Sequence, residues 1–175
     1  MKLIFKFVIA LSLLVASADA HAYVYFTRDA LITSFFPAGE VEVVAFTPDP
    51  ATLKATLGYA PPRKEWDILV GSHADGSPAY AIIDEQLGQH EPITFAVLLD
   101  AAAHVERLEV LVYREAYGDG VRAPAFRDQF RGLGPDAPMR PGKDIRIVSG
   151  ATVSTRSLSV GTRRACVVLA DWLDG

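Results

Sequence analysis

The segment Ile93–Tyr113 reads ITFAVLLDAAAHVERLEVLVY, and it decides the fold class of this chain. Two apolar runs, Ile93–Leu99 and Val105–Tyr113, are rich in the branched and aromatic residues that favour strands. Residues 100–104 between them allow only a short connection. The two runs are therefore predicted to pair as antiparallel strands.

Working outward from this pair, the pattern continues in both directions. Trp66–Val70 and Ala79–Asp84 are further strand-like runs, and Asp75-Gly76 between them is a hairpin signal. The other expected elements are a helix at Arg28–Phe36, a strand at Val41–Phe46, a helix from the cap Asp49 to Gly58, a short helix at Ala125–Arg131, a strand at Asp144–Val148 and a helix at Thr155–Leu173. This order predicts an α+β fold, in which an antiparallel sheet packs with a few helices in a single domain.

The N-terminus has the order of a secretory signal peptide. Lys2 and Lys6 precede Phe7–Ala16, an apolar run too short to span a bilayer as a helix. Small residues follow, and the A-x-A cleavage rule fits after Ala20 and after Ala22. We therefore expect residues 1–20 to be removed and the mature protein to be exported to the periplasm. The alternative is an uncleaved anchor or a buried first helix.

Composition excludes several kinds of function. Without residues 1–20, the chain has 15 basic and 20 acidic side chains, a net charge of −5. An acidic chain is a poor partner for nucleic acid or for an anionic membrane surface. Cys166 is the single cysteine and is expected to be buried, and His73, His90 and His104 lack the spacing of a metal site. Any redox activity must therefore come from a bound cofactor.

The string Ser149-Gly150-Ala151-Thr152 lies where an alternating apolar segment gives way to a helical pattern. Its small residues favour a tight turn that presents Thr152 just ahead of a helix N-terminus. Backbone N–H groups at that end have no intrahelical partner and carry partial positive charge, which favours a phosphate. The pattern alone fits equally well a small-residue turn with a Ser/Thr helix cap.

This string resembles the flavinylation motif of the FMN-binding domain family, which includes the flavin-carrying subunits of sodium-pumping NADH:quinone reductases and of Rnf complexes. In that family a flavin transferase esterifies FMN, through its phosphate, to the last threonine of the motif, which corresponds to Thr152. A second segment is also similar, REAYGDGV at Arg114–Val121 followed by Phe126-x-x-Gln129-Phe130-x-Gly132. The resemblance covers about residues 67–173. It implies an FMN-binding domain at 67–175, after an N-terminal segment at 23–66 that holds helices and one strand.

The resemblance implies FMN as the cofactor and a site built from two segments. Its residues are Ser149, Gly150, Ala151 and Thr152 from the motif, and Glu115, Tyr117, Gly118 and Gly120 from the loop. Gly118 or Gly120 would let the backbone close over the flavin ring, while Tyr117 would stack on the ring or exclude water. Glu115 could bond the flavin or the loop, or balance Arg114. Phe126 and Phe130 are expected in the core rather than against the flavin.

One position departs from the family pattern. Relatives often have an acidic residue three before the motif serine, where this chain has Arg146. Asp144 lies two residues earlier and would share the same face of a strand. If Asp144 does not substitute, FMN would bind without the covalent bond.

The function expected from these features is that of an exported FMN-binding electron carrier. It would be matured by a flavin transferase and would work with redox partner proteins or a membrane electron-transfer complex. No acid–base pair or substrate pocket can be identified in the sequence, which favours a carrier whose flavin performs the chemistry. An FMN-dependent periplasmic reductase and a cofactor-free interaction module with the same fold remain as alternatives.

Overall fold

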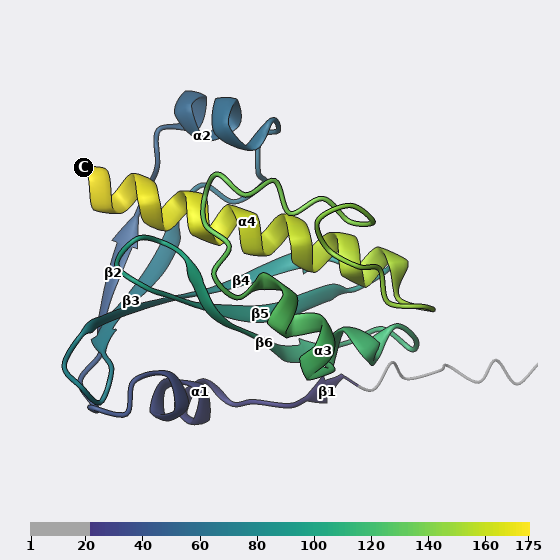
Figure 1. Ribbon diagram of the computed structural model, residues 1–175, viewed down its shortest axis with the longest axis horizontal. Helices are drawn as coiled ribbons and strands as arrows, with labels where there is room; N and C mark the ends of the chain where they lie inside the picture. Colours follow the sequence, from purple (N-terminus) through teal and green to yellow (C-terminus); the bar gives the residue numbers. More distant parts are fainter. Residues whose placement is uncertain (1–21) are drawn as a thin grey trace, which may run out of the picture.

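The computed structural model describes residues 22–175 (Figure 1). The expected signal peptide at residues 1–20 lies outside the described residues. Within them, one β-sheet packs with helices on both faces, which confirms the predicted α+β class. No helix in this part of the chain is long and apolar enough to cross a membrane.

Six strands form one antiparallel sheet in the order β1-β6-β5-β4-β3-β2. Strands β2 to β6 are neighbours both in the sequence and in the sheet, so the predicted meander is confirmed. The strand bounds are β1 Tyr23–Val24, β2 Glu42–Phe46, β3 Trp66–Ser72, β4 Pro78–Leu87, β5 Pro92–Leu99 and β6 Val105–Tyr113. Both edge strands, β1 and β2, come from the N-terminal segment at residues 23–66. This segment therefore contributes to the same sheet as the rest of the chain. Strand β1 was not predicted because two residues carry no alternation.

The helices begin and end largely where local signals place them. Their bounds are α1 Arg28–Phe35, α2 Pro50–Leu57, η1 Asp119–Arg122, α3 Pro124–Arg127, η2 Asp128–Phe130 and α4 Thr152–Asp174. Asp49 caps α2 by accepting a hydrogen bond from Thr52 N at 2.8 Å, and Gly58 ends it with a left-handed φ of +82°. The predicted short helix at 125–131 is observed as α3 followed by one 3-10 turn.

Two hydrophobic cores lie on opposite faces of the sheet. Helix α4 crosses one face, above strands β4 and β5 in Figure 1, and helix α1 covers part of the other. At Gly161 of α4, an added Cβ would overlap the ring of Phe95 in β5, so the glycine lets the helix approach the sheet closely. Phe126 and Phe130 are buried in the α4-side core with their ring centroids 5.4 Å apart, as expected.

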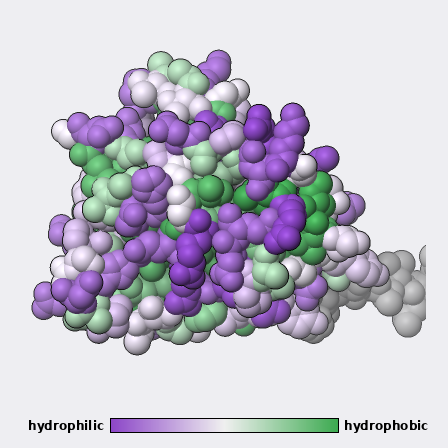
Figure 2. Space-filling view, in the orientation of Figure 1, coloured by the Kyte–Doolittle hydropathy of each residue, from purple (hydrophilic) through white to green (hydrophobic). Residues whose placement is uncertain are grey.

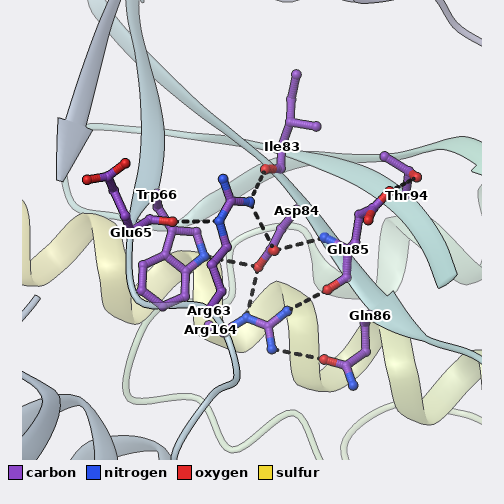
Figure 3. A network of polar contacts seen from close by, with 9 residues as sticks. All are labelled: Arg63, Glu65, Trp66, Ile83, Asp84, Glu85, Gln86, Thr94 and Arg164. Atoms are coloured by element: carbon purple, nitrogen blue, oxygen red, sulfur yellow. Dashed lines mark hydrogen bonds and ion pairs between the residues drawn. The ribbon is translucent and has the colours of Figure 1, made fainter. Parts of the chain in front are cut away.

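A buried polar network ties α4 to the sheet (Figure 3). The carboxylate of Asp84 in β4 accepts hydrogen bonds from Arg164 Nε at 2.8 Å and from Trp66 Nε1 at 3.2 Å. Arg164 also donates to Gln86 and to the Glu85 carbonyl, so its guanidinium is fully engaged. Removing either charge of such a pair leaves the other buried and uncompensated, which destabilises a fold strongly.

Residues 144–148 do not form the predicted strand. The Asp144 carboxylate accepts hydrogen bonds from the backbone N–H of Arg140 at 2.7 Å and from its Nε at 2.9 Å, which closes a turn. The backbone N–H groups of Arg146 and Val148 donate to the side chains of Gln129 and Thr155. Since side chains satisfy these backbone groups, no strand partner is needed, and pairing is limited to one bridge between Pro141 and Ile145.

Candidate functional site

The Ser149–Thr152 segment forms a tight turn that leads directly into helix α4. Ala151 N donates to the Val148 carbonyl at 3.0 Å, and Gly150 has a left-handed φ of +75°. Helix α4 begins at Thr152, three residues earlier than expected. Thr152 is therefore the first residue of the helix rather than a turn residue ahead of it.

The N-terminus of α4 offers free backbone donors. Ala151 occupies the cap position and its side chain makes no capping hydrogen bond. The first helical hydrogen bond runs from Thr155 N to the Ala151 carbonyl at 2.8 Å. The backbone N–H groups of residues 152–154 therefore have no helical acceptor, and the positive end of the helix dipole lies with them. This arrangement suits an anion.

Of the four hydroxyls around this turn, two are engaged inside the protein. Thr155 is buried, and its Oγ1 accepts a hydrogen bond from Val148 N at 3.3 Å. Ser154 is buried as well, and its Oγ lies 2.8 Å from the hydroxyl of Tyr113. Ser149 and Thr152 are exposed. Only these two could be modified without unpacking the turn.

The fold brings the glycine-rich loop against the start of α4. A hollow of about 260 Å³ lies between them. Its lining consists of Gln89, Glu115, Tyr117, Gly118, Gly150, Ala151, Thr152, Val153 and Ser154. Six of the eight predicted site residues line this hollow. Ser149 and Gly120 do not, and Thr152 is the one exposed hydroxyl of the turn that does.

Tyr113 joins the loop to the helix. Its hydroxyl donates to the Tyr117 carbonyl at 2.6 Å and pairs with Ser154 Oγ. Burial raises the pKa of Tyr113, with the Ser154 hydrogen bond acting in the opposite sense. Gly118 lies against this pair: an added Cβ would come within 2.7 Å of the Tyr113 hydroxyl and 2.9 Å of Ser154 Oγ.

Gly118 and Gly120, either of which was expected to let the backbone close over a flavin ring, both lie against other parts of the protein. Gly118 has a φ of +92° and borders the hollow, yet its missing side chain makes room for Tyr113 and Ser154. Gly120 lies in η1, where an added Cβ would approach the side chain of Val148. Packing of the protein accounts for both glycines.

Tyr117 and Glu115 have opposite surroundings at the hollow. Tyr117 is 86% exposed and offers an aromatic face to whatever occupies the rim. Glu115 Oε1 accepts hydrogen bonds from the backbone N–H of His90 at 2.6 Å and of Glu91 at 3.1 Å. Glu115 therefore bonds the turn between β4 and β5, a partner that was not among those expected from the sequence.

Asp144 is not placed as a substitute for the missing acidic residue. The expected strand that would have set its side chain beside position 146 is absent, and its carboxylate is held by Arg140. These hydrogen bonds with Arg140 hold the pKa of Asp144 below its usual range. Arg146 donates instead to Gln129 Oε1.

Three lining residues of the hollow are not apparent as site residues in the sequence. Ser154 stands out there only as another hydroxyl, and Val153 carries no signal. Gln89 lies far away in the sequence, and only the pairing of β4 with β5 brings its turn to the loop. Tyr113, four residues before Tyr117, does not line the hollow but positions its wall.

Three further features of the described residues bear on metal, thiol and pocket chemistry. No group of three or more His, Cys, Asp or Glu side chains in residues 22–175 could hold a metal ion. Burial raises the pKa of the Cys166 thiol to about 12, so it stays protonated at neutral pH. A larger hollow of about 750 Å³ lies on the α1 side of the sheet and includes Arg28, Arg63 and Glu85, but none of the predicted site residues.

Comparison with known proteins bears on the fold. No protein-family model matches the chain, and no curated protein matches it. Among solved structures, a subunit of the Na(+)-translocating NADH-quinone reductase from Parabacteroides distasonis is similar, with a TM-score of 0.53 and 13% sequence identity. The match covers 77% of this chain and 78% of that chain. The chain therefore shares its fold with a component of that reductase.

Proposed function

We propose that this protein is an electron carrier that holds FMN through a phosphoester bond to Thr152. The observation that carries the proposal is the position of Thr152, an exposed hydroxyl on the first residue of an uncapped 23-residue helix, beside a hollow. The two segments that resemble the FMN-binding domain family meet at this hollow. The fold shared with a component of a quinone reductase supports the same proposal.

The residues present fit a phosphorylated flavin. The free N–H groups of residues 152–154 would hold the phosphate, and the exposed face of Tyr117 would contact the flavin ring. The Glu115 carboxylate is drawn toward the β4–β5 turn by backbone donors, which limits its repulsion of the phosphate. When bound, the flavin supplies transfer of one or two electrons.

Covalent attachment needs an activated donor, since joining an alcohol to a free phosphate with loss of water is unfavourable in water. We propose FAD as that donor, used by a flavin transferase. The Thr152 oxygen forms a bond to the phosphorus of the riboflavin phosphate half, and the diphosphate bond breaks. AMP leaves with the electron pair, and the hydroxyl proton passes to a base of the transferase.

The proposal includes export to the periplasm, with cleavage after Ala20 or Ala22. The flavin transferase and the redox partners, whether proteins or a membrane electron-transfer complex, belong to the same proposal. The charged, apolar and small-residue order of residues 1–22 supports export.

The protein is co-produced with a flavin transferase, and its intact mass tests both the cleavage of the signal peptide and the covalent attachment of FMN. We expect a mature chain that lacks 20 or 22 residues and carries the mass of one FMN less one water. Thr152→Val should lose this increment and the fluorescence of the denatured band. Valine has nearly the same shape as threonine and the position is exposed, so the free energy of unfolding should change by less than about 0.5 kcal/mol.

Ser149→Ala is the matched control, because it removes the other exposed hydroxyl of the turn. It should keep the flavin. Covalent flavin on the Thr152→Val chain would contradict the assignment of Thr152. Loss of covalent flavin from the Ser149→Ala chain would show that the transferase needs Ser149, which belongs to the motif. Flavin absorbance of native Thr152→Val protein would show binding without the bond. A wild-type chain without flavin would leave the cofactor-free module as the function.

A further inference from the structure

The charge of this chain is divided very unevenly along its length. Residues 121–164, which contain the loop before α4 and its first half, hold nine Lys and Arg but three Asp and Glu. The other described residues hold six Lys and Arg and seventeen Asp and Glu. An acidic protein thus has one strongly basic part, and this part contains Thr152.

Most of these basic side chains are free of acidic partners. Arg127, Arg140 and Arg164 form ion pairs with Glu109, Asp144 and Asp84. The remaining six have no ion pair within residues 22–175, and they are Arg122, Arg131, Lys143, Arg146, Arg156 and Arg163. All of them except Arg163 are exposed. Arg131, Lys143 and Arg156 also make no side-chain hydrogen bond within residues 22–175, so their charge faces the solvent.

Several of these cations lie on or beside the first half of α4, in which Arg156 is one turn after Thr152. Thr152, Arg156 and Val160 are four residues apart on α4, so they follow one another along its exposed face. Arg140 and Arg163 border Val160 in a shallow hollow of about 230 Å³. The loop before α4 runs alongside the first half of the helix (Figure 1) and carries Lys143 and Arg146. We call the three exposed cations without an ion pair on these segments, Lys143, Arg146 and Arg156, the cationic face.

We propose that the cationic face docks an acidic electron-carrier protein and so brings the carrier's redox centre beside the flavin on Thr152. This proposal rests on the proposed function. Charge complementarity steers such encounters and raises the association rate. The interface between two electron-transfer proteins is small, and their complex is short-lived. Two carrier molecules, each with an oxidised metal ion, would take one electron each from a reduced flavin. The flavin returns to its oxidised form and releases two protons to water.

The surface favours a protein over an anionic bilayer. The large apolar residues exposed near Thr152 and along the first half of α4 are Tyr117, Ile147, Val153 and Val160, which do not form the continuous apolar stripe of a membrane-binding helix. On the face viewed in Figure 2, hydrophilic side chains interrupt the apolar areas. A bilayer extends far beyond the cationic face and would be repelled by the acidic excess in the rest of the chain, whereas a small carrier contacts a limited area.

Two carriers of opposite charge test the proposal. Plant plastocyanin is acidic and mitochondrial cytochrome c is basic, and both accept an electron readily from a reduced flavin. The flavin-loaded protein is reduced and mixed with each carrier in a stopped-flow instrument. We expect the rate with plastocyanin to fall about tenfold as ionic strength rises from about 0.01 M to about 0.3 M. The rate with cytochrome c should not fall.

A charge-reversal pair provides the matched variants. Lys143→Glu/Arg156→Glu should slow the reaction with plastocyanin at low salt by about tenfold. Arg28→Glu/Lys64→Glu changes net charge equally at exposed positions outside the basic part and should have little effect. Equal slowing by both pairs, or rates independent of salt with both carriers, would overturn the proposal.

A second measurement needs no flavin. Amide shifts of the isotope-labelled chain carrying Thr152→Val are followed as plastocyanin is added at low salt. Shifts should appear at residues 140–163 and vanish in the Lys143→Glu/Arg156→Glu background. Shifts with phosphatidylglycerol vesicles but none with plastocyanin would assign the face to a membrane and sink the carrier proposal. Shifts with plastocyanin in a chain that never acquires flavin would support docking while contradicting the proposed cofactor.

Discussion

Among single residues, Gly118 has both a backbone conformation and surroundings that exclude a side chain. Its φ is +92°, and an added Cβ would crowd the Tyr113 and Ser154 hydroxyls. We expect Gly118→Ala to lower the free energy of unfolding by about 2 kcal/mol. Gly150→Ala is the control, because Gly150 has a φ of +75° with open space around it, and it should cost about 1 kcal/mol. If urea titrations gave equal losses of unfolding free energy for the two variants, Gly118 would be needed for its backbone conformation alone.

The hydrogen bonds between Glu115 and the β4–β5 turn depend on pH. Burial alone would raise its pKa, but backbone N–H donors at residues 89–91 outweigh this and lower the pKa below its usual value of 4.5. The stability that the charged Glu115 carboxylate contributes is therefore complete above the usual pKa, and it is lost as pH falls through the lowered pKa. The amide resonances of His90 and Glu91 should shift together with a midpoint below 4.5, and Glu115→Gln should abolish this transition. Glu91→Gln should leave it in place. A midpoint at or above 4.5 would contradict the prediction.

Among the elements, α4 depends on the glycine where it crosses β5. A glycine within a helix is normally improved by alanine, by about 1 kcal/mol. At Gly161 the sign should reverse, because the added methyl would overlap Phe95, and we expect a loss of about 1–3 kcal/mol. Combining Gly161→Ala with Phe95→Leu should cost less than the sum of the single changes. A stabilising Gly161→Ala in urea unfolding would show that the helix has room to move away.

Elements with strong local signals were predicted well from the sequence. The four central strands alternate or run apolar over seven or more residues, and α2 has its own cap and stop. The segment 144–148 alternates equally well, but the hydrogen bonds of Arg140, Gln129 and Thr155 decide its conformation, and none of these can be seen in an alternation pattern. In the site, the motif residues could be found, whereas Tyr113 and Gln89 depend on how distant segments meet.

At the scale of the whole molecule, net charge was an incomplete guide. The net charge of −5 without residues 1–20 suggested a protein that avoids anionic surfaces. The sum conceals a basic part at residues 121–164, opposite in sign to the rest of the chain. This division can be counted in the sequence, but only the arrangement of elements shows that Lys143, Arg146 and Arg156 lie on or beside the first half of α4.

Helix α4 follows all six strands in the chain, yet it covers the larger of the two cores. If the chain is exported as proposed, it emerges N-terminus first, and the apolar face of the meander is exposed until its cover follows, which invites binding by a holdase chaperone. Thr152 is also the residue at which that cover begins. A maturation enzyme that recognises the turn, the hollow and the helix end together would meet them only in a chain that has finished folding. Flavin attachment at Thr152 would then occur only on chains that have finished folding and would leave incompletely folded chains unmodified.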